Sequence, residues 1–140
     1  MEIINERLKD SLSRDYNFRE IMISKAHSTY TLQSEGLNLA GYIESISGIR
    51  IAILDHILLD ESKISRGIAL KSLQTLENKL KEMGAEYFFA YFNESQTVRF
   101  LSTCGFLQIY PKDLEKENTN LSKYLYENLG LKTLLYKKLR

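Results

Sequence analysis

The sequence has little of what marks secreted, disulfide-linked or membrane proteins. Its 140 residues include one cysteine, Cys104, which excludes an internal disulfide and suits a reducing compartment. No apolar run approaches the roughly 20 residues that span a bilayer. The first residues also lack the basic-then-apolar order of a secretion signal. We therefore expect a cytoplasmic protein that makes no membrane contact.

A strong charge of one sign is also missing. The formal net charge is +1, so nothing global attracts nucleic acid or an anionic membrane. Lys132, Lys137, Lys138 and Arg140 form a small basic group, which we interpret as the solvated face of a last strand. The sequence contains no internal repeat, linker or low-complexity stretch. With 44% hydrophobic and 26% charged residues, it indicates a single globular domain over residues 1–140 with no nucleic-acid partner.

The first half of the chain alternates between helical and strand-like patterns. Apolar residues spaced by four predict a helix through about Phe18, and residues 20–26 fit either a helix or a strand. Alternating segments at 29–33 and 39–43, separated by Ser34-Glu35-Gly36, predict a hairpin. After a turn at Ser47-Gly48, the β-branched run 49–59 predicts a long strand.

A strong amphipathic helix follows. Residues 66–83 place apolar side chains at steps of three and four, and Gly84 stands where a left-handed C-terminal cap belongs. Glu77 and Lys81 are spaced as a favourable i,i+4 pair. The next run, 87–92, is apolar on both faces, which is typical of a parallel strand covered from both sides.

The last third contains shorter elements. We predict a helix over 95–103, a strand over 106–110 that the only proline, Pro111, ends, and a polar loop over 112–120. A helical turn or two near 121–129 and a strand over 131–139 follow. This order predicts an α/β fold: a mixed, mostly antiparallel sheet with a central parallel crossover and helices on both faces.

The join between the long strand and the helix is a candidate phosphate site. Residues 65–70 turn through Gly67 into the helix, whose first backbone N–H groups lack intrahelical partners and carry the positive end of the helix dipole. Such a helix start suits a phosphate. A plain strand-to-helix junction explains the same residues equally well.

The motifs together resemble the GNAT superfamily of acyl-CoA-dependent N-acetyltransferases. That family's pyrophosphate loop reads Gln/Arg-x-x-Gly-x-Gly/Ala, and Gly67 and Ala69 match its last two fixed positions, whereas Ile64 occupies the first. Asn93 followed by a short helix and Gly105-Phe106 resembles the later family signature, with one extra residue between Asn93 and Gly105. The resemblance covers roughly residues 29–140.

The resemblance implies a site for acetyl-CoA as co-substrate and no metal. It places the end of the long strand against the pantetheine arm, the amides of the loop around the pyrophosphate, and two later residues beside the arm. These are Ile57, Leu58 and Leu59; Ile64, Ser65, Arg66, Gly67, Ile68, Ala69 and Leu70; and Asn93 and Phe100. The Arg66 side chain either adds charge to a phosphate or is simply solvated at the helix start.

Asp55 is the candidate general base, because it is a carboxylate in an otherwise apolar strand. Counting by alternation puts it on the face of Ile57, where partial desolvation would raise its pKa toward the range of a base. Asp55 could instead pair with a lysine or lie at a frayed edge. We expect His56 to point to the opposite face, into the core or toward a helix.

The general acid is harder to find. The family usually carries a tyrosine four residues before its Gly-Phe pair, and this chain has Leu101 there, beside Phe100. Tyr91 is our candidate replacement, with Tyr110 as another, although strand tyrosines often only pack. Alternatively, the thiolate leaves without an acid, or catalysis has been lost. A backbone N–H near Leu58 would stabilise the oxyanion.

Three functions fit these residues. The first is an N-acetyltransferase that moves an acetyl group from acetyl-CoA to a primary amine by direct attack on the thioester. The acceptor would be a small molecule or a peptide, and the enzyme a possible homodimer. The second is a weak or inactive GNAT-fold module that binds acyl-CoA as a sensor or scaffold. The third is a small α/β domain that binds a protein partner.

Overall fold

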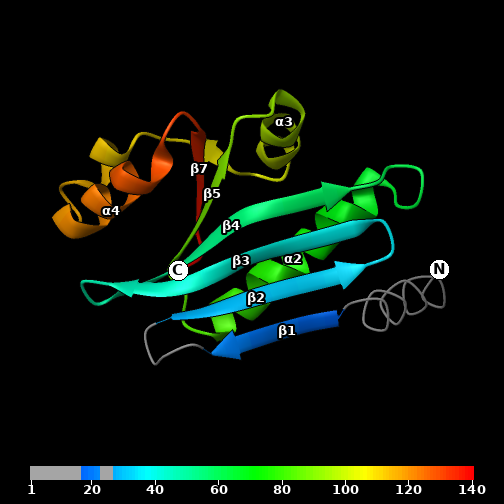
Figure 1. Cartoon of the computed structure of the whole chain (residues 1–140), viewed down its shortest axis with the longest axis horizontal. Coiled ribbons are helices and arrows are strands. Elements are labelled where there is room, and N and C mark those ends of the chain that lie inside the picture. The colour runs from blue at the N-terminus through cyan, green and yellow to red at the C-terminus, as the bar shows by residue number, and fades with distance from the viewer. Residues whose placement is uncertain (1–16, 23–26) are drawn as a thin grey trace.

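The computed structural model describes residues 17–22 and 27–140, which form one seven-stranded sheet with helices on both faces (Figure 1). The sheet order is β1-β2-β3-β4-β5-β7-β6. The strands are β1 (Asn17–Met22), β2 (His27–Ser34), β3 (Leu37–Ile46), β4 (Ile49–Leu59), β5 (Tyr87–Phe92), β6 (Leu107–Gln108) and β7 (Thr133–Lys138). The helices are α2 (Arg66–Glu82), α3 (Ser95–Thr103), η1 (Pro111–Leu114) and α4 (Thr119–Leu129). Within these residues, none of the helices has the length and apolarity needed to cross a membrane.

Strands β1 to β4 form an antiparallel meander. The predicted hairpin and the second turn are confirmed, since Gly36 and Gly48 both have positive φ values, +85° and +82°, which glycine adopts without strain. Residues 17–22 form a strand. The sequence predicted the end of a helix at about Phe18 and either a helix or a strand over residues 20–26. The helix predicted before Asn17 lies outside the described residues.

The predicted parallel crossover is confirmed. β4 leads through α2 into β5, and the two strands pair in parallel. Ser65 caps the start of α2 by accepting a hydrogen bond from the Ile68 amide, and Gly84 follows the helix with φ +91°. The chain therefore returns to the sheet with its next strand beside β4.

Two apolar clusters cover the two faces of the sheet. Cluster 1 contains the buried face of α2, with Leu73, Leu76 and Leu80, and the α3 residue Leu101. Cluster 2 lies on the other face and contains Leu121 and Leu125 of α4. The β5 strand contributes to both clusters, which confirms that it is covered from both sides.

The segment after Pro111 differs from the predicted loop. It forms η1 and then the complete helix α4, whose first turn is capped by the Asn118 side chain accepting from the Leu121 amide. The strand predicted over 106–110 is limited to β6. Helix caps in short polar stretches are hard to predict from sequence, because the same residue types occur in loops and at helix starts.

The predicted charge pairing on α2 is also corrected. Glu77 pairs with Lys137 of β7, with 2.8 Å between the Glu77 Oε1 and Lys137 Nζ atoms, rather than with Lys81. The Lys137 side chain is only 20% exposed, so it does not belong to a solvated basic face. This ion pair links α2 to β7, beyond β5 in the sheet order.

Candidate functional site

The two central strands separate halfway along β4. Their parallel pairing runs from Ile51 opposite Tyr87 to Leu54 opposite Ala90 and ends there. Beyond that pair, β4 continues beside β3, while β5 continues beside β7. We call the divergence of residues 55–59 from β5 the β4–β5 split. Figure 1 shows β5 and β7 running at a steep angle to the first four strands.

A β-bulge lies where the split begins. Gly41 of β3 is opposite Leu54 and Ala40 is opposite His56, so the register skips Asp55. A bulge bends its strand and interrupts the alternation of side chains. Accordingly, Ile53 belongs to cluster 2, whereas Ile57 packs against cluster 1. The counting by which we placed Asp55 on the face of Ile57 therefore fails.

Asp55 and His56 are both exposed. The predicted core or helix-facing position of His56 is therefore wrong, because the bulge puts this residue beyond the part of β4 that β5 covers. Partial burial nevertheless raises the pKa of Asp55, and a hydrogen bond with its own backbone, His56 and Lys132 oppose this rise.

The loop after β4 is held rigidly at the start of α2. The Asp60 amide donates to the Gly36 carbonyl at 2.7 Å, and the Asp60 side chain accepts from the amide and hydroxyl of Ser62. The amides of Lys63 and Ile64 donate back to the Asp60 carbonyl. A Cβ on Gly36 would lie 2.9 Å from the Lys63 and Ile64 side chains, so only glycine lets the loop pack here.

Three amides remain free at the start of α2. Among the described residues, nothing accepts a hydrogen bond from the amides of Ser65, Arg66 or Gly67, whereas those of Ile68 and Ala69 donate to Ser65. A Cβ on Gly67 would have the Ser65 hydroxyl, 3.9 Å away, as its nearest neighbour. The backbone at Gly67 is therefore uncovered on its Cβ side, and unpaired amides at a helix start suit an anion.

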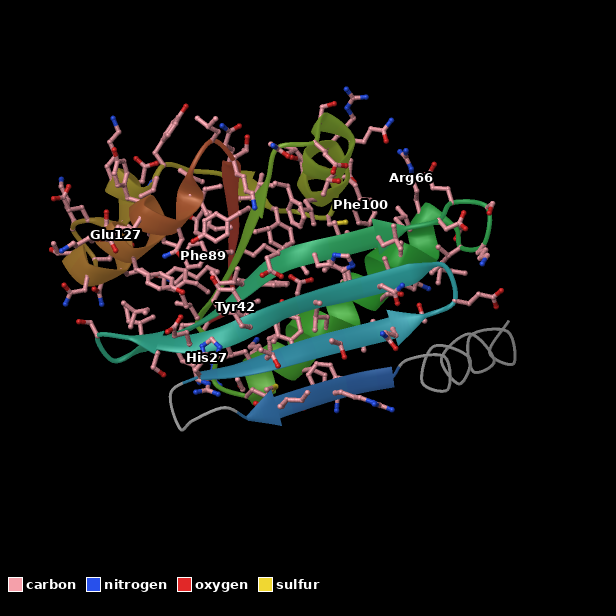
Figure 2. The ribbon with its side chains drawn as sticks, in the orientation of Figure 1. His27, Tyr42, Arg66, Phe89, Phe100 and Glu127 are labelled. Carbon is pink, nitrogen blue, oxygen red and sulfur yellow. The ribbon has the colours of Figure 1, made fainter. Side chains whose placement is uncertain are left out.

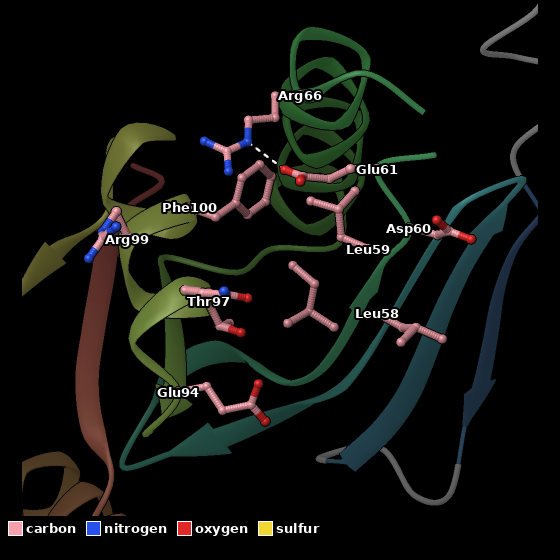
Figure 3. Close-up of a pocket in the computed structure, with 11 residues that line it drawn as sticks. Leu58, Leu59, Asp60, Glu61, Arg66, Glu94, Thr97, Arg99 and Phe100 are labelled. Carbon is pink, nitrogen blue, oxygen red and sulfur yellow. Dashed lines mark hydrogen bonds and ion pairs between the residues drawn. The ribbon is translucent and has the colours of Figure 1, made fainter. Parts of the chain in front are cut away.

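A cavity of about 640 Å³ connects the split to this helix start. Its walls are the end of β4, the loop, the first residue of α2 and one side of α3 (Figure 3). It is lined by Ile57, Leu58, Leu59, Asp60, Glu61, Arg66, Glu94, Gln96, Thr97, Arg99 and Phe100. Figure 2 shows Arg66 and Phe100 at the same end of the molecule, away from Tyr42 and His27.

Both signs of charge line this cavity. The Arg66 Nε atom donates to the Glu61 carboxylate at 2.5 Å, and the Arg66 side chain is 72% exposed (Figure 3). Arg99 of α3 adds a second guanidinium, while Asp60 and Glu94 add carboxylates. Glu61 therefore pairs with the Nε side of the guanidinium at the start of α2.

The comparisons with known proteins agree on the fold. Neither a protein-family model nor a curated protein matches the sequence. Among solved structures, an acetyltransferase from Thermus thermophilus superposes with a TM-score of 0.54 at 16% identity, over 83% of this chain and 66% of that one. Nourseothricin acetyltransferase superposes with a TM-score of 0.52 at 9% identity, over 90% of this chain and 85% of that one.

A third similar structure is N-acetylglutamate synthase from Neisseria gonorrhoeae, complexed with coenzyme A and N-acetyl-glutamate. Its TM-score is 0.51 at 13% identity, and the alignment covers all of this chain and 33% of that one. This chain has the GNAT acetyltransferase fold. It spans two thirds or less of the length of the Thermus and Neisseria proteins.

The GNAT fold brings together some of the predicted acyl-CoA residues and leaves others apart. Those that line the cavity are Ile57, Leu58, Leu59, Arg66 and Phe100. Ile64 and Ala69 are buried in cluster 1, Ile68 and Leu70 pack against it, and Asn93 is exposed outside the cavity lining. Ser65 and Gly67 contribute free amides beside the cavity rather than side chains in its wall.

The two predicted catalytic side chains also lie outside the cavity wall. Tyr91 is the first β5 residue past the last β4–β5 pair and belongs to cluster 2. Its hydroxyl is buried and has no hydrogen-bond partner among the described residues. Burial raises the pKa of Tyr91, so this phenol keeps its proton at neutral pH. Tyr110, the other candidate acid, is 59% exposed.

The sequence reasoning missed several residues of the cavity. Gln96, Thr97 and Arg99 line it, yet none belongs to a motif that we identified. The spacing of Gln96, Arg99 and Phe100 on a nine-residue helix could have indicated a shared face. Gly41 inside an apolar strand was a further signal, because strand glycines often mark bulges.

Proposed function

We propose that this chain is an acetyl-CoA-dependent N-acetyltransferase that acts on a primary amine. The observation that supports this best is the β4–β5 split, since within residues 17–22 and 27–140 it leaves an edge of β4 unpaired beside the cavity and the free amides of α2. An unpaired strand edge suits a ligand that carries its own amide groups, and a free helix start suits a diphosphate. Coenzyme A has both.

The chain's own residues divide the binding of acetyl-CoA among three elements. The amides of Ser65, Arg66 and Gly67 would bind the diphosphate, with the guanidinium of Arg66 once it leaves Glu61. The backbone of residues 57–59 would pair with the amide-bearing arm, and Phe100 would cover it. Acetyl-CoA supplies an acyl group already activated as a thioester.

For catalysis, we propose that Asp55 takes the proton of the incoming amine at its carboxylate. Its raised pKa suits this role. A backbone N–H near Leu58 or Leu59 would donate to the developing oxyanion, so the side chains there are free to vary. The hydroxyl of Tyr91, protonated and without a partner among the described residues, would donate to the departing thiolate.

We propose the acceptor by its chemical class. The similar structures include the NatC complex bound to a Gag peptide and CoA, with a TM-score of 0.53 at 12% identity over 80% of this chain and 71% of that one. A primary amine of a small molecule or of a peptide is therefore the class that we propose. Residues 111–120, which form η1 and the start of α4, are candidates for selecting it.

A second function is favoured by one observation on α3. Leu101 is completely buried in cluster 1, and the α3 residues that line the cavity are Gln96, Thr97, Arg99 and Phe100, none of which is an acid suited to a thiolate. If Tyr91 does not replace the missing donor, the chain would bind acyl-CoA without efficient turnover and act as a sensor or scaffold.

Calorimetric titration with acetyl-CoA, followed by an assay of thiol release, tests both functions. We expect saturable heat with acetyl-CoA and much weaker binding of S-acetyl-pantetheine, which lacks the diphosphate. A thiol signal that depends on an added amine supports the enzyme, and binding without that signal supports the sensor. No heat at high micromolar acetyl-CoA would refute both.

A further inference from the structure

A buried tyrosine reaches across the sheet to the point where the split begins. The Tyr30 hydroxyl of β2 donates to the Ile53 carbonyl of β4 over 2.6 Å, although β3 lies between the two strands. The Tyr30 side chain is 1% exposed and packs in cluster 1. A hydroxyl that spans a neighbouring strand inside the core needs a gap in that strand.

Gly41 of β3 provides this gap. It is opposite Tyr30 on one side and opposite Leu54 on the other. A Cβ on Gly41 would lie 1.8 Å from the Ile53 oxygen and 2.6 Å from the Tyr30 hydroxyl, so no side chain larger than hydrogen fits between them. The three residues form one arrangement on three adjacent strands.

This arrangement coincides with the bulge. The register of β3 and β4 shifts between Ala40 and Gly41, and the last β4–β5 pair is Leu54 with Ala90. The carbonyl that accepts from Tyr30 therefore belongs to the residue that precedes the last β4 residue paired with β5. A buried carbonyl without a donor is costly, so the hydroxyl favours the bulged conformation over a regular strand.

We propose that Tyr30 is a positioning residue for the acyl-CoA site. Its hydroxyl fixes the bulge through the Ile53 carbonyl, the bulge directs residues 55–59 away from β5, and the unpaired edge of β4 is therefore already in place before a ligand binds. Tyr30 itself does not line the cavity. The consequence for binding rests on the proposed function, whereas the effect on the bulge does not.

Tyr30→Phe removes the hydroxyl and keeps the ring. The matched control is Tyr87→Phe, because Tyr87 also loses a hydroxyl hydrogen bond, to Glu117 at 2.5 Å, but lies at the paired end of β5. We expect at least tenfold weaker binding of acetyl-CoA for Tyr30→Phe in calorimetry and a change within twofold for Tyr87→Phe. Equal affinities for Tyr30→Phe and the unmodified chain would overturn the proposal.

Hydrogen exchange in the ligand-free protein separates this proposal from the proposed function. The amides of residues 53–58 should exchange at least tenfold faster in Tyr30→Phe, with no such change in Tyr87→Phe, whether or not the chain binds acetyl-CoA. If the unmodified chain binds no acetyl-CoA, the proposed function fails and exchange alone decides the role of Tyr30. Unchanged exchange would refute that role.

The unmodified protein offers a test that does not require Tyr30→Phe to fold. The Tyr30 hydroxyl proton should be visible by NMR, exchange far more slowly than that of Tyr126, which is 74% exposed, and show a nuclear Overhauser effect to the Gly41 α protons. A Tyr30 hydroxyl proton that exchanges as fast as that of Tyr126 would contradict the proposal.

Discussion

At the scale of single residues, Asp55 combines an exposed position with a raised pKa. A carboxyl group whose pKa is higher in the folded state than its unfolded value near 3.9 prefers to fold protonated, so stability falls as the pH rises through that window. Asp55→Asn removes this penalty. We expect a small gain in melting temperature at pH 7, none below about pH 3, and loss of the amine-dependent thiol release.

The two readouts for Asp55→Asn must move in opposite directions. Thermal melts at both pH values measure stability, and the pH dependence of kcat/KM measures the base. Glu127→Gln is a suitable control, since it neutralises an exposed carboxylate on α4 that does not line the cavity. A pH–rate profile of Asp55→Asn with an unchanged acidic limb would remove Asp55 from the role of base.

Substituting Tyr91 should also affect stability and activity in different ways. Its buried hydroxyl has no partner among the described residues, so Tyr91→Phe removes a group that folding leaves unpaired. We expect the free energy of unfolding in urea to stay level or rise by about 1 kcal/mol. If this hydroxyl protonates the thiolate, kcat should fall about a hundredfold. An unchanged kcat would indicate that the thiolate leaves unassisted.

These residues also show where sequence reasoning reaches its limit. Asp55 and Tyr91 are candidates because a carboxylate in an apolar strand and a tyrosine near a missing acid are visible in the sequence. The face of Asp55 could not be found by counting, because the bulge inserts one residue into the alternation. The same insertion leaves His56 exposed where alternation predicted a covered position.

At the scale of elements, substituting Gly67 tests whether glycine is needed here for the backbone of α2 or for the approach of a ligand. Its φ lies outside the left-handed region, and a Cβ there would meet nothing closer than 3.9 Å. Gly67→Ala should therefore raise the free energy of unfolding by about 0.4–1 kcal/mol, because alanine lowers the conformational entropy of the unfolded chain. A methyl group beside the free amides should nevertheless weaken acetyl-CoA binding about tenfold.

Urea titration and calorimetry measure the two effects of Gly67→Ala separately. Gln74→Ala changes an exposed position in the middle of the same helix and should leave the affinity for acetyl-CoA within twofold. Unchanged affinity in Gly67→Ala would mean that no ligand approaches the backbone at this position and that the residue belongs to a plain strand-to-helix junction.

Helices marked by repeated apolar spacing and a following glycine were easier to predict than those that begin at a single side-chain cap. The bounds of α3 match the prediction, and α2 ends within one residue of it, because several turns of apolar periodicity and a following glycine define each helix. In contrast, η1 and the start of α4 depend on single side-chain caps from Asp113 and Asn118. Local hydrogen bonds of this kind favour loops and helix starts alike.

At the scale of the whole molecule, the parallel crossover was predictable from the residues, whereas the point at which β4 and β5 diverge was not. An apolar strand on each side of an amphipathic helix indicates a crossover. The point where the two strands diverge depends on Tyr30, Gly41 and Ile53, which meet only once three strands are assembled. In the same way, the cavity joins residues 57–66 to residues 94–100 across an entire helix and strand.

The Glu77–Lys137 ion pair joins α2 and β7, which lie on either side of β5 in the chain. Both side chains are at most 20% exposed, and the Lys137 ammonium also lies 5.3 Å from the centre of the Phe106 ring. Lys137→Met leaves a largely buried carboxylate without its partner and should lower the free energy of unfolding by about 3 kcal/mol. Adding Glu77→Leu to that variant should restore most of the loss, because an apolar pair of similar volume replaces both charges.

A double-mutant cycle in urea measures this coupling directly. Lys138→Met is the control, since the neighbouring side chain is exposed and should change stability by less than about 0.5 kcal/mol. Because the pair lies in the face of the sheet covered by α2, its loss should lower the stability of the sheet without moving the free amides of α2. The affinity for acetyl-CoA, measured well below the melting temperature, should therefore stay within twofold in the double variant. Additive effects of the two substitutions would show that the ion pair contributes no coupling between α2 and β7.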